Sequence, residues 1–100
     1  MTPADRDARP TVTRVTLLVA GDTGMSAAAK ANLAAIMVDQ PAAGVDASII
    51  DVLEEPDFAL RYRAFFTPTL ILETATRLTR VVGDLRDSQA VRLLLAAPAD

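Results

Sequence analysis

The residues from Thr67 to Leu85, TPTLILETATRLTRVVGDL, decide the fold of this chain because they satisfy two different patterns. The runs Leu70–Leu72 and Leu78–Val82 are aliphatic and β-branched, which predicts two short strands. Residues 73–76 between them contain no Gly, Pro or Asn, so the signal for a hairpin turn is weak. The stretch equally predicts an amphipathic helix, because apolar residues recur at helical spacing in Ile71, Ala75, Leu78 and Val82. Both interpretations stay open on the pattern alone.

The residues after this stretch predict a turn and then a helix. Glycine gives Gly83-Asp84-Leu85 the backbone freedom of a turn. Asp87 or Ser88 is a suitable N-cap for a final helix over the apolar run Val91–Leu95. The same run is apolar enough to form a buried strand instead, so this segment is ambiguous as well.

The residues before the decisive stretch predict a short helix. Pro56 suits its first position, where the missing N–H is harmless, and Glu54 or Glu55 is the cap. The aromatic residues that follow at i, i+4 and i+7 are Phe58, Tyr62 and Phe65. We expect this aromatic stripe to pack in the core.

The N-terminal half predicts a strand, a helix and a second strand. Val12–Val19 is dense in β-branched residues, which is typical of a buried strand. Ser26 is a suitable N-cap for a helix that ends just before Pro41. Val45–Leu53 reads VDASIIDVL and predicts the second strand. Short connections favour a right-handed crossover with the two strands parallel.

The length of the chain suits one domain. The protein has 100 residues, of which 51% are hydrophobic and 23% are charged, as in globular proteins. Residues 1–11 are polar, charged and contain two prolines, which predicts a disordered tail. The single domain is therefore expected over residues 12–97.

The composition excludes several classes of function. The chain has no Cys, His or Trp, so thiol chemistry, zinc sites of the usual kind and a histidine base are excluded. A net charge of -3 argues against nucleic acid as a partner. No apolar run is long enough to span a bilayer, and no signal peptide is recognisable, so we expect a cytoplasmic protein.

Acidic residues are the remaining candidates for chemistry. They occur in the run 54–57 and at Asp84 and Asp87, in each case before a predicted helix. Carboxylates at such positions serve as caps and complement the helix dipole, and their spacing is not that of an EF-hand. We therefore expect no catalytic residues, no metal site and no cofactor, so the chain is not expected to be an enzyme.

The order of strand, helix, strand, helix, hairpin and helix is similar to that of thioredoxin-like domains. These domains place a cis-proline where Thr67-Pro68 lies. Where thioredoxins carry their redox cysteines, this chain has the residues from Asp22 to Ser26. The resemblance therefore implies an α/β thioredoxin-like βαβαββα scaffold without redox activity.

Four motifs together resemble the KaiB family. They are VAGDTGMS at Val19–Ser26, IDVLEEPDFA at Ile50–Ala59, TPTL at Thr67–Leu70 and VVGDL at Val81–Leu85. Each motif is weak alone, but their order and spacing fit the family from about residue 12 to residue 95.

The resemblance implies two alternative folds and a set of partners. KaiB proteins bind the N-terminal ring of KaiC, a hexameric RecA-like ATPase, and in cyanobacteria they help time the circadian cycle and sequester KaiA. The free protein commonly rests as a tetramer with a βαββααβ fold, and the binding form is a thioredoxin-like monomer. The switch concerns the second half, where the pattern here is ambiguous. The sensor domain of SasA kinases keeps the thioredoxin-like form.

The resemblance also assigns candidate site residues. Ile50, Asp51, Val52 and Leu53 match the second strand and its exit, next to the surface that contacts KaiC. Asp84 is a further partner-binding candidate. The residues that match the fold-switch or hinge positions are Thr67, Pro68, Gly83 and Asp84.

The sequence departs from the cyanobacterial pattern at two places. Glu73–Thr76 stands where the family has a proline-rich bend, and Glu54-Glu55 replaces a lysine-asparagine pair. These departures indicate a divergent bacterial paralogue that serves a simple timer or stress adaptation.

Two hypotheses about function follow. The first is a non-catalytic regulator that binds a KaiC-like ATPase, with a KaiA-like protein or a SasA-like kinase as further partners and a homodimer or homotetramer at rest. The second is a thioredoxin-like adaptor or sensor domain that binds a signalling kinase.

Overall fold

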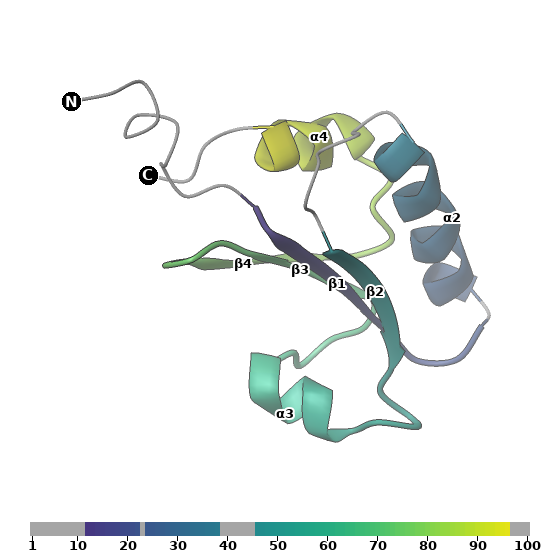
Figure 1. The fold of residues 1–100 in the computed structure, drawn as a ribbon. Coiled ribbons are helices and arrows are strands. Elements are labelled where there is room, and N and C mark those ends of the chain that lie inside the picture. Colours follow the sequence, from purple (N-terminus) through teal and green to yellow (C-terminus); the bar gives the residue numbers. More distant parts are fainter. Residues whose placement is uncertain (1–11, 23, 39–45, 97–100) are drawn as a thin grey trace.

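The computed structural model of the chain describes residues 12–22, 24–38 and 46–96 (Figure 1). The elements along the chain are β1 (Arg14–Val19), α2 (Gly24–Val38), β2 (Asp46–Asp51), α3 (Asp57–Tyr62), β3 (Thr69–Glu73), β4 (Leu78–Val82) and α4 (Ser88–Ala96). This βαβαββα order confirms the thioredoxin-like prediction, and the alternative βαββααβ order is not the one adopted here. The predicted tail at 1–11 and the loop at 41–44 lie outside the described residues.

A four-stranded sheet lies at the centre, in the order β2-β1-β3-β4. β1 and β2 are parallel, as the N-terminal pattern predicted, whereas β3 is antiparallel to both β1 and β4. Helices α2 and α4 cover one face of the sheet, and α3 covers the other (Figure 1). β2 and β4 are the two edges of the sheet.

The decisive stretch forms the hairpin of β3 and β4, so its helical interpretation is wrong for this structure. The turn is closed by Thr74, whose N–H donates to the carbonyl of Arg77 at 2.9 Å. Its hydroxyl oxygen also accepts hydrogen bonds from the N–H groups of Thr76, at 3.2 Å, and Arg77, at 2.9 Å. A threonine hydroxyl can thus supply the turn chemistry that Gly, Pro or Asn usually provide.

The larger hydrophobic core fills the space between the sheet and the helices α2 and α4. Successive side chains of a strand point to opposite faces, so Val15, Leu17 and Val19 of β1 face this core and Leu18 faces away. β3 contributes Leu70 and Leu72. The remaining buried members are Val12, Ala29, Leu33, Ile36, Leu85, Val91 and Leu95.

The smaller core lies between the sheet and α3. Its buried members are Leu18, Tyr62 and Ile71, and five half-buried residues pack around them. Tyr62 holds α3 against the sheet, because its hydroxyl donates to the carboxylate of Glu73 at 2.8 Å and its carbonyl accepts from Arg80 Nε at 2.7 Å. This layer therefore depends on polar contacts more than the larger core does.

The predicted aromatic stripe is only partly correct. Tyr62 is buried and Phe58 is half-buried, with ring centroids 6.4 Å apart, but Phe65 is 85% exposed. The reason is that α3 ends at Tyr62, and Arg63 adopts the left-handed conformation with φ 52°. The i+7 position is no longer on the helix, so helical spacing does not apply to Phe65.

The predicted helix ends are also partly correct. Asp87 caps α4, since its carboxylate accepts from the N–H of Ala90 at 3.2 Å, and the strand interpretation of Val91–Leu95 is wrong here. Ser26 is not an N-cap, because α2 already begins at Gly24. Pro56 is the N-cap of α3 and not its first residue, and no side chain caps that helix.

Candidate partner-binding surface

Most of the predicted site residues lie at one end of the sheet, where β1, β2 and β4 end and β3 begins. We call this the carboxyl end of the sheet. The strand register places Ile50, Leu18, Thr69 and Val82 in one row across the four strands. The next row continues from Asp51, paired with Val19, to Pro68 and Gly83.

The structure brings the predicted hinge residues together. The N–H of Gly83 donates to the carbonyl of Pro68 at 2.9 Å, which extends the ladder of β3 and β4 by one pair. The Thr67-Pro68 peptide bond is cis, as the thioredoxin-like resemblance implied, and Pro68 is buried. The predicted partner-binding residues of β2 lie at the same end, two strand spacings from Pro68 and three from Gly83, which are about 10 and 15 Å.

Hydrogen bonds fix the turn that leaves β2. Asp51 accepts with its carboxylate from the N–H of Leu53 at 2.9 Å, and with its carbonyl from the N–H groups of Glu54 and Glu55 at 3.0 and 2.9 Å. The N–H of Val52 donates to the carbonyl of Val19 at 2.9 Å. The turn is therefore ordered and attached to the central strand.

Of the four residues from Ile50 to Leu53, three stabilise the turn and only Leu53 is exposed. Ile50 and Val52 pack against the smaller core, so they anchor the turn to the face of the sheet that α3 covers. Asp51 closes the turn. Leu53 is 72% exposed, and it stands next to the exposed Glu54 and Glu55. An apolar side chain with a charged rim is typical of the centre of a protein interface.

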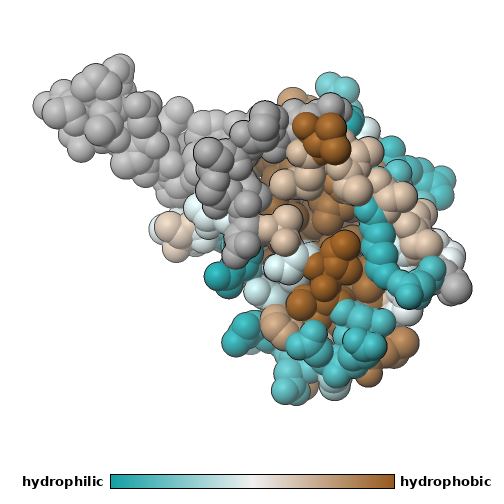
Figure 2. Space-filling model, turned by 45° about the vertical axis from the view of Figure 1, so that its right-hand side comes forward, coloured by the Kyte–Doolittle hydropathy of each residue, from teal (hydrophilic) through white to brown (hydrophobic). Residues whose placement is uncertain are grey.

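Hydrophobic surface is visible on the side of the molecule that carries α2 and β2. Figure 2, in which the right-hand side of Figure 1 comes forward, shows brown surface bordered by teal hydrophilic side chains. Ile49 of the edge strand β2 is 50% exposed, and Met25 at the start of α2 is 52% exposed. A sheet edge with exposed apolar side chains is a common docking surface for another chain.

The turn after β4 requires an unusual backbone. Gly83 has φ 117°, although an added Cβ would meet no atom within 4 Å. The requirement for glycine is thus conformational and not steric. Leu85 also adopts a positive φ of 64°, and its side chain is 4% exposed in the larger core. Burial of Leu85 compensates for its strained backbone, which costs about 1–2 kcal/mol for a non-glycine residue.

Asp84 links the turn to its surroundings. Its carboxylate accepts from the Arg86 guanidinium at 3.0 Å, and its carbonyl accepts from Asn32 Nδ2 of α2 at 2.7 Å. The hydrogen bond from Arg86 lowers the pKa of the Asp84 carboxyl below its usual value. The Asp84 side chain is 13% exposed, so it is less accessible to a partner than Leu53. A hollow of about 350 Å³, lined by Met25, Gly83 and Asp84 among others, lies beside it.

The resemblance to thioredoxin-like domains places the loop after β1 where thioredoxins carry their redox cysteines. Buried Ser26 ties it down, accepting from the N–H of Ala20 at 3.2 Å and donating to its carbonyl at 3.4 Å. Asp22 and Lys30 form an ion pair on the surface. The chain has no Cys or His, and among residues 12–22, 24–38 and 46–96 no three acidic side chains gather as metal ligands would. The loop therefore offers polar contacts and no nucleophile of the thioredoxin type.

Sequence reasoning missed the contributions of Asn32 and Met25 to this surface. Asn32 belongs to no motif, and Met25 lies in the motif Val19–Ser26 but received no role from it. Both reach the carboxyl end only because α2 packs beside the turn after β4. None of the helices that the structure describes is long and apolar enough to cross a membrane.

Comparison with solved structures shows the fold. The N-terminal domain of SasA from Synechococcus elongatus superposes with a TM-score of 0.64 at 24% identity, covering 83% of this chain and 80% of that domain. Mitochondrial thioredoxin 3 from Saccharomyces cerevisiae superposes with a TM-score of 0.66 at 22% identity, covering 81% of this chain and 74% of thioredoxin 3. These likenesses establish a thioredoxin-like fold.

Comparison with protein sequences shows the family. The circadian clock protein KaiB3 of Synechocystis sp. is 34% identical over 77 residues, which are 77% of this chain and 76% of KaiB3. The family model of the KaiB domain matches residues 16–97, which include all four motifs and every predicted site residue. The chain therefore belongs to the KaiB family.

Proposed function

We propose that this chain is a non-catalytic regulator that binds a KaiC-type RecA-like ATPase through the carboxyl end of its sheet. The observation that carries the proposal is the ordered turn after β2, which presents Leu53 in the βαβαββα arrangement. The family resemblance associates this arrangement with the binding form. Membership of the KaiB family and the likeness to KaiB3, a circadian clock protein, support a role in a clock or timer.

The proposed contact has an apolar centre and a charged rim. Leu53 is its anchor, and Glu54 and Glu55 meet basic groups of the ATPase at the edge. Asp84 and Gly83 act through the shape of the turn after β4, where Asp84 is already bonded to Arg86 and Asn32. A few anchors contribute most of the binding free energy in such interfaces, and rim charges contribute mainly to the association rate.

We further propose that the domain of residues 12–97 changes its fold in the second half. Thr67, Pro68, Gly83 and Asp84 are the hinge. The proposal is supported by the two patterns that the sequence from Thr67 to Leu85 satisfies, and by the positive φ angles of Gly83 and Leu85 on either side of Asp84. A homo-oligomer at rest would use the other fold.

A second candidate function is that of an adaptor for a signalling kinase. The observation that favours it is the shared fold with the N-terminal domain of SasA. Both candidates use a thioredoxin-like surface without cysteines, so the partner that binds distinguishes them.

A binding measurement with matched leucine variants tests the proposal. The ATP-loaded KaiC-type ATPase of the host, or in parallel a SasA-type histidine kinase, is immobilised, and binding of the chain is followed by biolayer interferometry. We expect Leu53→Glu to weaken binding to the ATPase at least tenfold, about 1.4 kcal/mol. The control is Leu93→Glu, because Leu93 is 61% exposed on α4, on the other face of the sheet. Equal binding by both variants would contradict the assigned surface, and binding to the kinase alone would favour the adaptor.

A further inference from the structure

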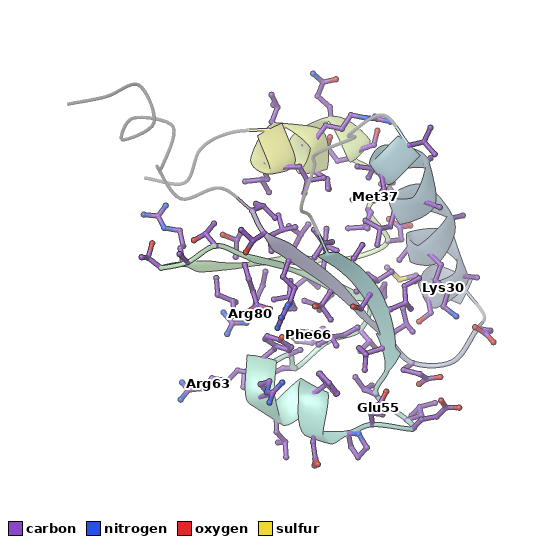
Figure 3. The ribbon with its side chains drawn as sticks, in the orientation of Figure 1. Lys30, Met37, Glu55, Arg63, Phe66 and Arg80 are labelled. Atoms are coloured by element: carbon purple, nitrogen blue, oxygen red, sulfur yellow. The ribbon has the colours of Figure 1, made fainter. Side chains whose placement is uncertain are left out.

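A second exposed apolar surface lies at the C-terminal end of α3, and the regulator function does not account for it. Leu60, Phe65 and Phe66 are 78%, 85% and 68% exposed. Leu60 and Phe65 line a pocket of about 330 Å³ together with Ala59, Arg63 and Ala64, and Phe66 is the next residue along the chain. We call Leu60, Arg63, Phe65 and Phe66 the Phe65 surface. Figure 3 shows Arg63 and Glu55 at opposite ends of α3, so this surface is separate from the turn after β2.

Hydrogen bonds hold the two phenylalanines in place. The N–H of Ala64 donates to the carbonyl of Ala59 at 2.9 Å, and the hydroxyl of Thr69 donates to the carbonyl of Phe66 at 2.5 Å. The left-handed conformation of Arg63 turns the chain just before them. The connection is thus fixed at both ends, with its rings directed to solvent. Apolar side chains that cluster on the surface often mark an interaction site, whereas single exposed apolar side chains do not.

The segment that carries the Phe65 surface is basic in sequence, although the whole chain has a net charge of -3 and Asp57 lies beside Arg61 at the start of α3. From Phe58 to Leu72 there are two arginines, Arg61 and Arg63, and no acidic residue. Tyr62 adds one group of each sign, because its carbonyl accepts from Arg80 and its hydroxyl donates to Glu73. Among the described residues Arg63 forms no ion pair. The helix dipole accounts for a basic residue at the end of α3, but it does not account for the exposed phenylalanines beside it.

We propose that the Phe65 surface binds an acidic amphipathic segment of another protein. Apolar side chains of the segment enter the pocket beside Phe65, and its carboxylates meet Arg61 and Arg63. This contact is additional to the proposed ATPase contact at the carboxyl end of the sheet. A basic rim around a concave apolar patch is complementary to such a segment in both charge and shape.

Two other occupants fit the surface less well. A surface that inserts into a bilayer is usually a convex apolar tip. Leu60, Arg63 and Phe65 instead surround a concave pocket. A second copy of the chain offers the acidic turn after β2, but that turn has a single exposed apolar side chain, Leu53, for a patch that is three apolar residues wide. Both occupants are outcomes of the test below.

The test uses a synthetic helical peptide as the probe. The fluorescein-labelled peptide carries leucine or phenylalanine at i, i+3, i+4 and i+7 and glutamate at the flanking positions, and its control has lysine in place of each glutamate. Anisotropy is measured with the full chain. We expect the acidic peptide to bind at least tenfold more tightly than the basic one, with affinity falling as salt rises. Arg63→Glu and Phe65→Ser should each reduce this binding at least tenfold.

Matched variants separate this surface from the rest of the chain. Arg14→Glu changes an exposed arginine at the start of β1, and Leu93→Ser changes an exposed leucine of α4, so both should bind the peptide within twofold of the wild type. Arg63→Glu and Phe65→Ser should keep the far-ultraviolet circular dichroism spectrum, because both side chains are exposed. They should also keep their affinity for the ATPase, which distinguishes a failure here from a failure of the regulator function.

Three results would overturn the proposal. The first is equal binding of the acidic and basic peptides, or full binding by Arg63→Glu. The second is binding of the chain to phosphatidylglycerol vesicles, lost in Phe65→Ser, without binding to the peptide, which would assign the surface to a membrane. The third is a concentration-dependent increase in mass that Phe65→Ser abolishes, which would assign it to a second copy.

Discussion

Two strands from the two halves of the chain, β1 and β4, differ in how firmly burial defines them. In β1 of the N-terminal half, every residue from Val15 to Val19 is buried, and the strand lies between two neighbours. In β4 of the C-terminal half, no residue is fully buried, and the strand forms an edge of the sheet. A strand buried on both faces permits one hydrophobic pattern, whereas a half-exposed edge strand permits several. The difference agrees with the sequence patterns, because the segment of β4 satisfies two patterns and that of β1 only one.

The two halves also differ in the interactions that stabilise them. β1 and α2 supply half of the buried residues of the larger core, and the C-terminal half joins it through β3 and through Leu85, Val91 and Leu95. The contact between α3 and the sheet depends on the hydrogen bonds of Tyr62. We therefore expect substitutions in the first half to cost more global stability, and substitutions in the second half to act locally.

The largest effect is expected from Leu17→Ala in β1. Leu17 is fully buried in the larger core, and truncation of such a leucine costs about 2–5 kcal/mol. The matched variant in the second half is Val81→Ala, which should cost about 1 kcal/mol or less because Val81 is only half-buried. Urea denaturation followed by circular dichroism measures both values. Equal losses would show that the halves do not differ as described.

The next largest effect is expected from Gly83→Ala in the turn after β4. With φ 117°, alanine at this position should cost about 1–3 kcal/mol. Gly21→Ala, in the turn after β1 at φ 77°, is the control and should cost about 1 kcal/mol. If the second half changes its fold, Gly83→Ala should also produce a second set of amide peaks in ¹H–¹⁵N spectra for residues after Pro68. One set of peaks with unchanged stability would argue against Gly83 as a hinge.

A smaller effect is expected from Thr74→Val in the hairpin turn. The variant keeps the shape of the side chain but removes the hydroxyl oxygen that accepts from Thr76 and Arg77. The loss should be about 1 kcal/mol. Hydrogen exchange should accelerate in β3 and β4 but not in the β1–β2 pair, and Thr76→Val should change little. Uniform acceleration across the sheet would mean that the hairpin does not open separately.

The smallest effect is expected from Asp84→Asn, and it should depend on pH. Arg86 lowers the pKa of Asp84 in the folded protein, so the ionised carboxylate stabilises the fold above the unfolded pKa of about 4. This stabilisation is lost as the pH falls through the lowered pKa. Wild type should therefore be more stable than Asp84→Asn at pH 7, and the difference should shrink below about pH 4. Thermal denaturation at both pH values checks this, and a difference that grows in acid would be inconsistent with the pairing.

Sequence reasoning predicted the elements of the first half well, because Val12–Val19 is a continuous β-branched run and Pro41 limits the helix after it. The cis Thr67-Pro68 bond followed from the thioredoxin-like resemblance, and the turn at Gly83 followed from the glycine itself. The position of Phe65 could not be predicted, since it depends on the left-handed Arg63 that ends α3, and an arginine carries no signal for that conformation. The hairpin turn was equally hidden, because Thr74 closes it with a side-chain hydroxyl.

At the candidate site, the motif residues could be named from the sequence but their roles could not. Ile50 and Val52 support the turn after β2 and Leu53 is exposed, which depends on where β2 ends. The contact between Asn32 and Asp84 joins residues 52 positions apart, and no local pattern encodes it.

The central claim is that the chain binds a KaiC-type ATPase in the fold described here. Size-exclusion chromatography with light scattering tests it most directly, on the chain alone and after incubation with the host's KaiC-type ATPase and ATP. The account predicts that the chain co-elutes with the ATPase ring, that Leu53→Glu does not, and that Leu93→Glu does. No co-elution at any incubation time, with an ATPase that hydrolyses ATP, would contradict the account.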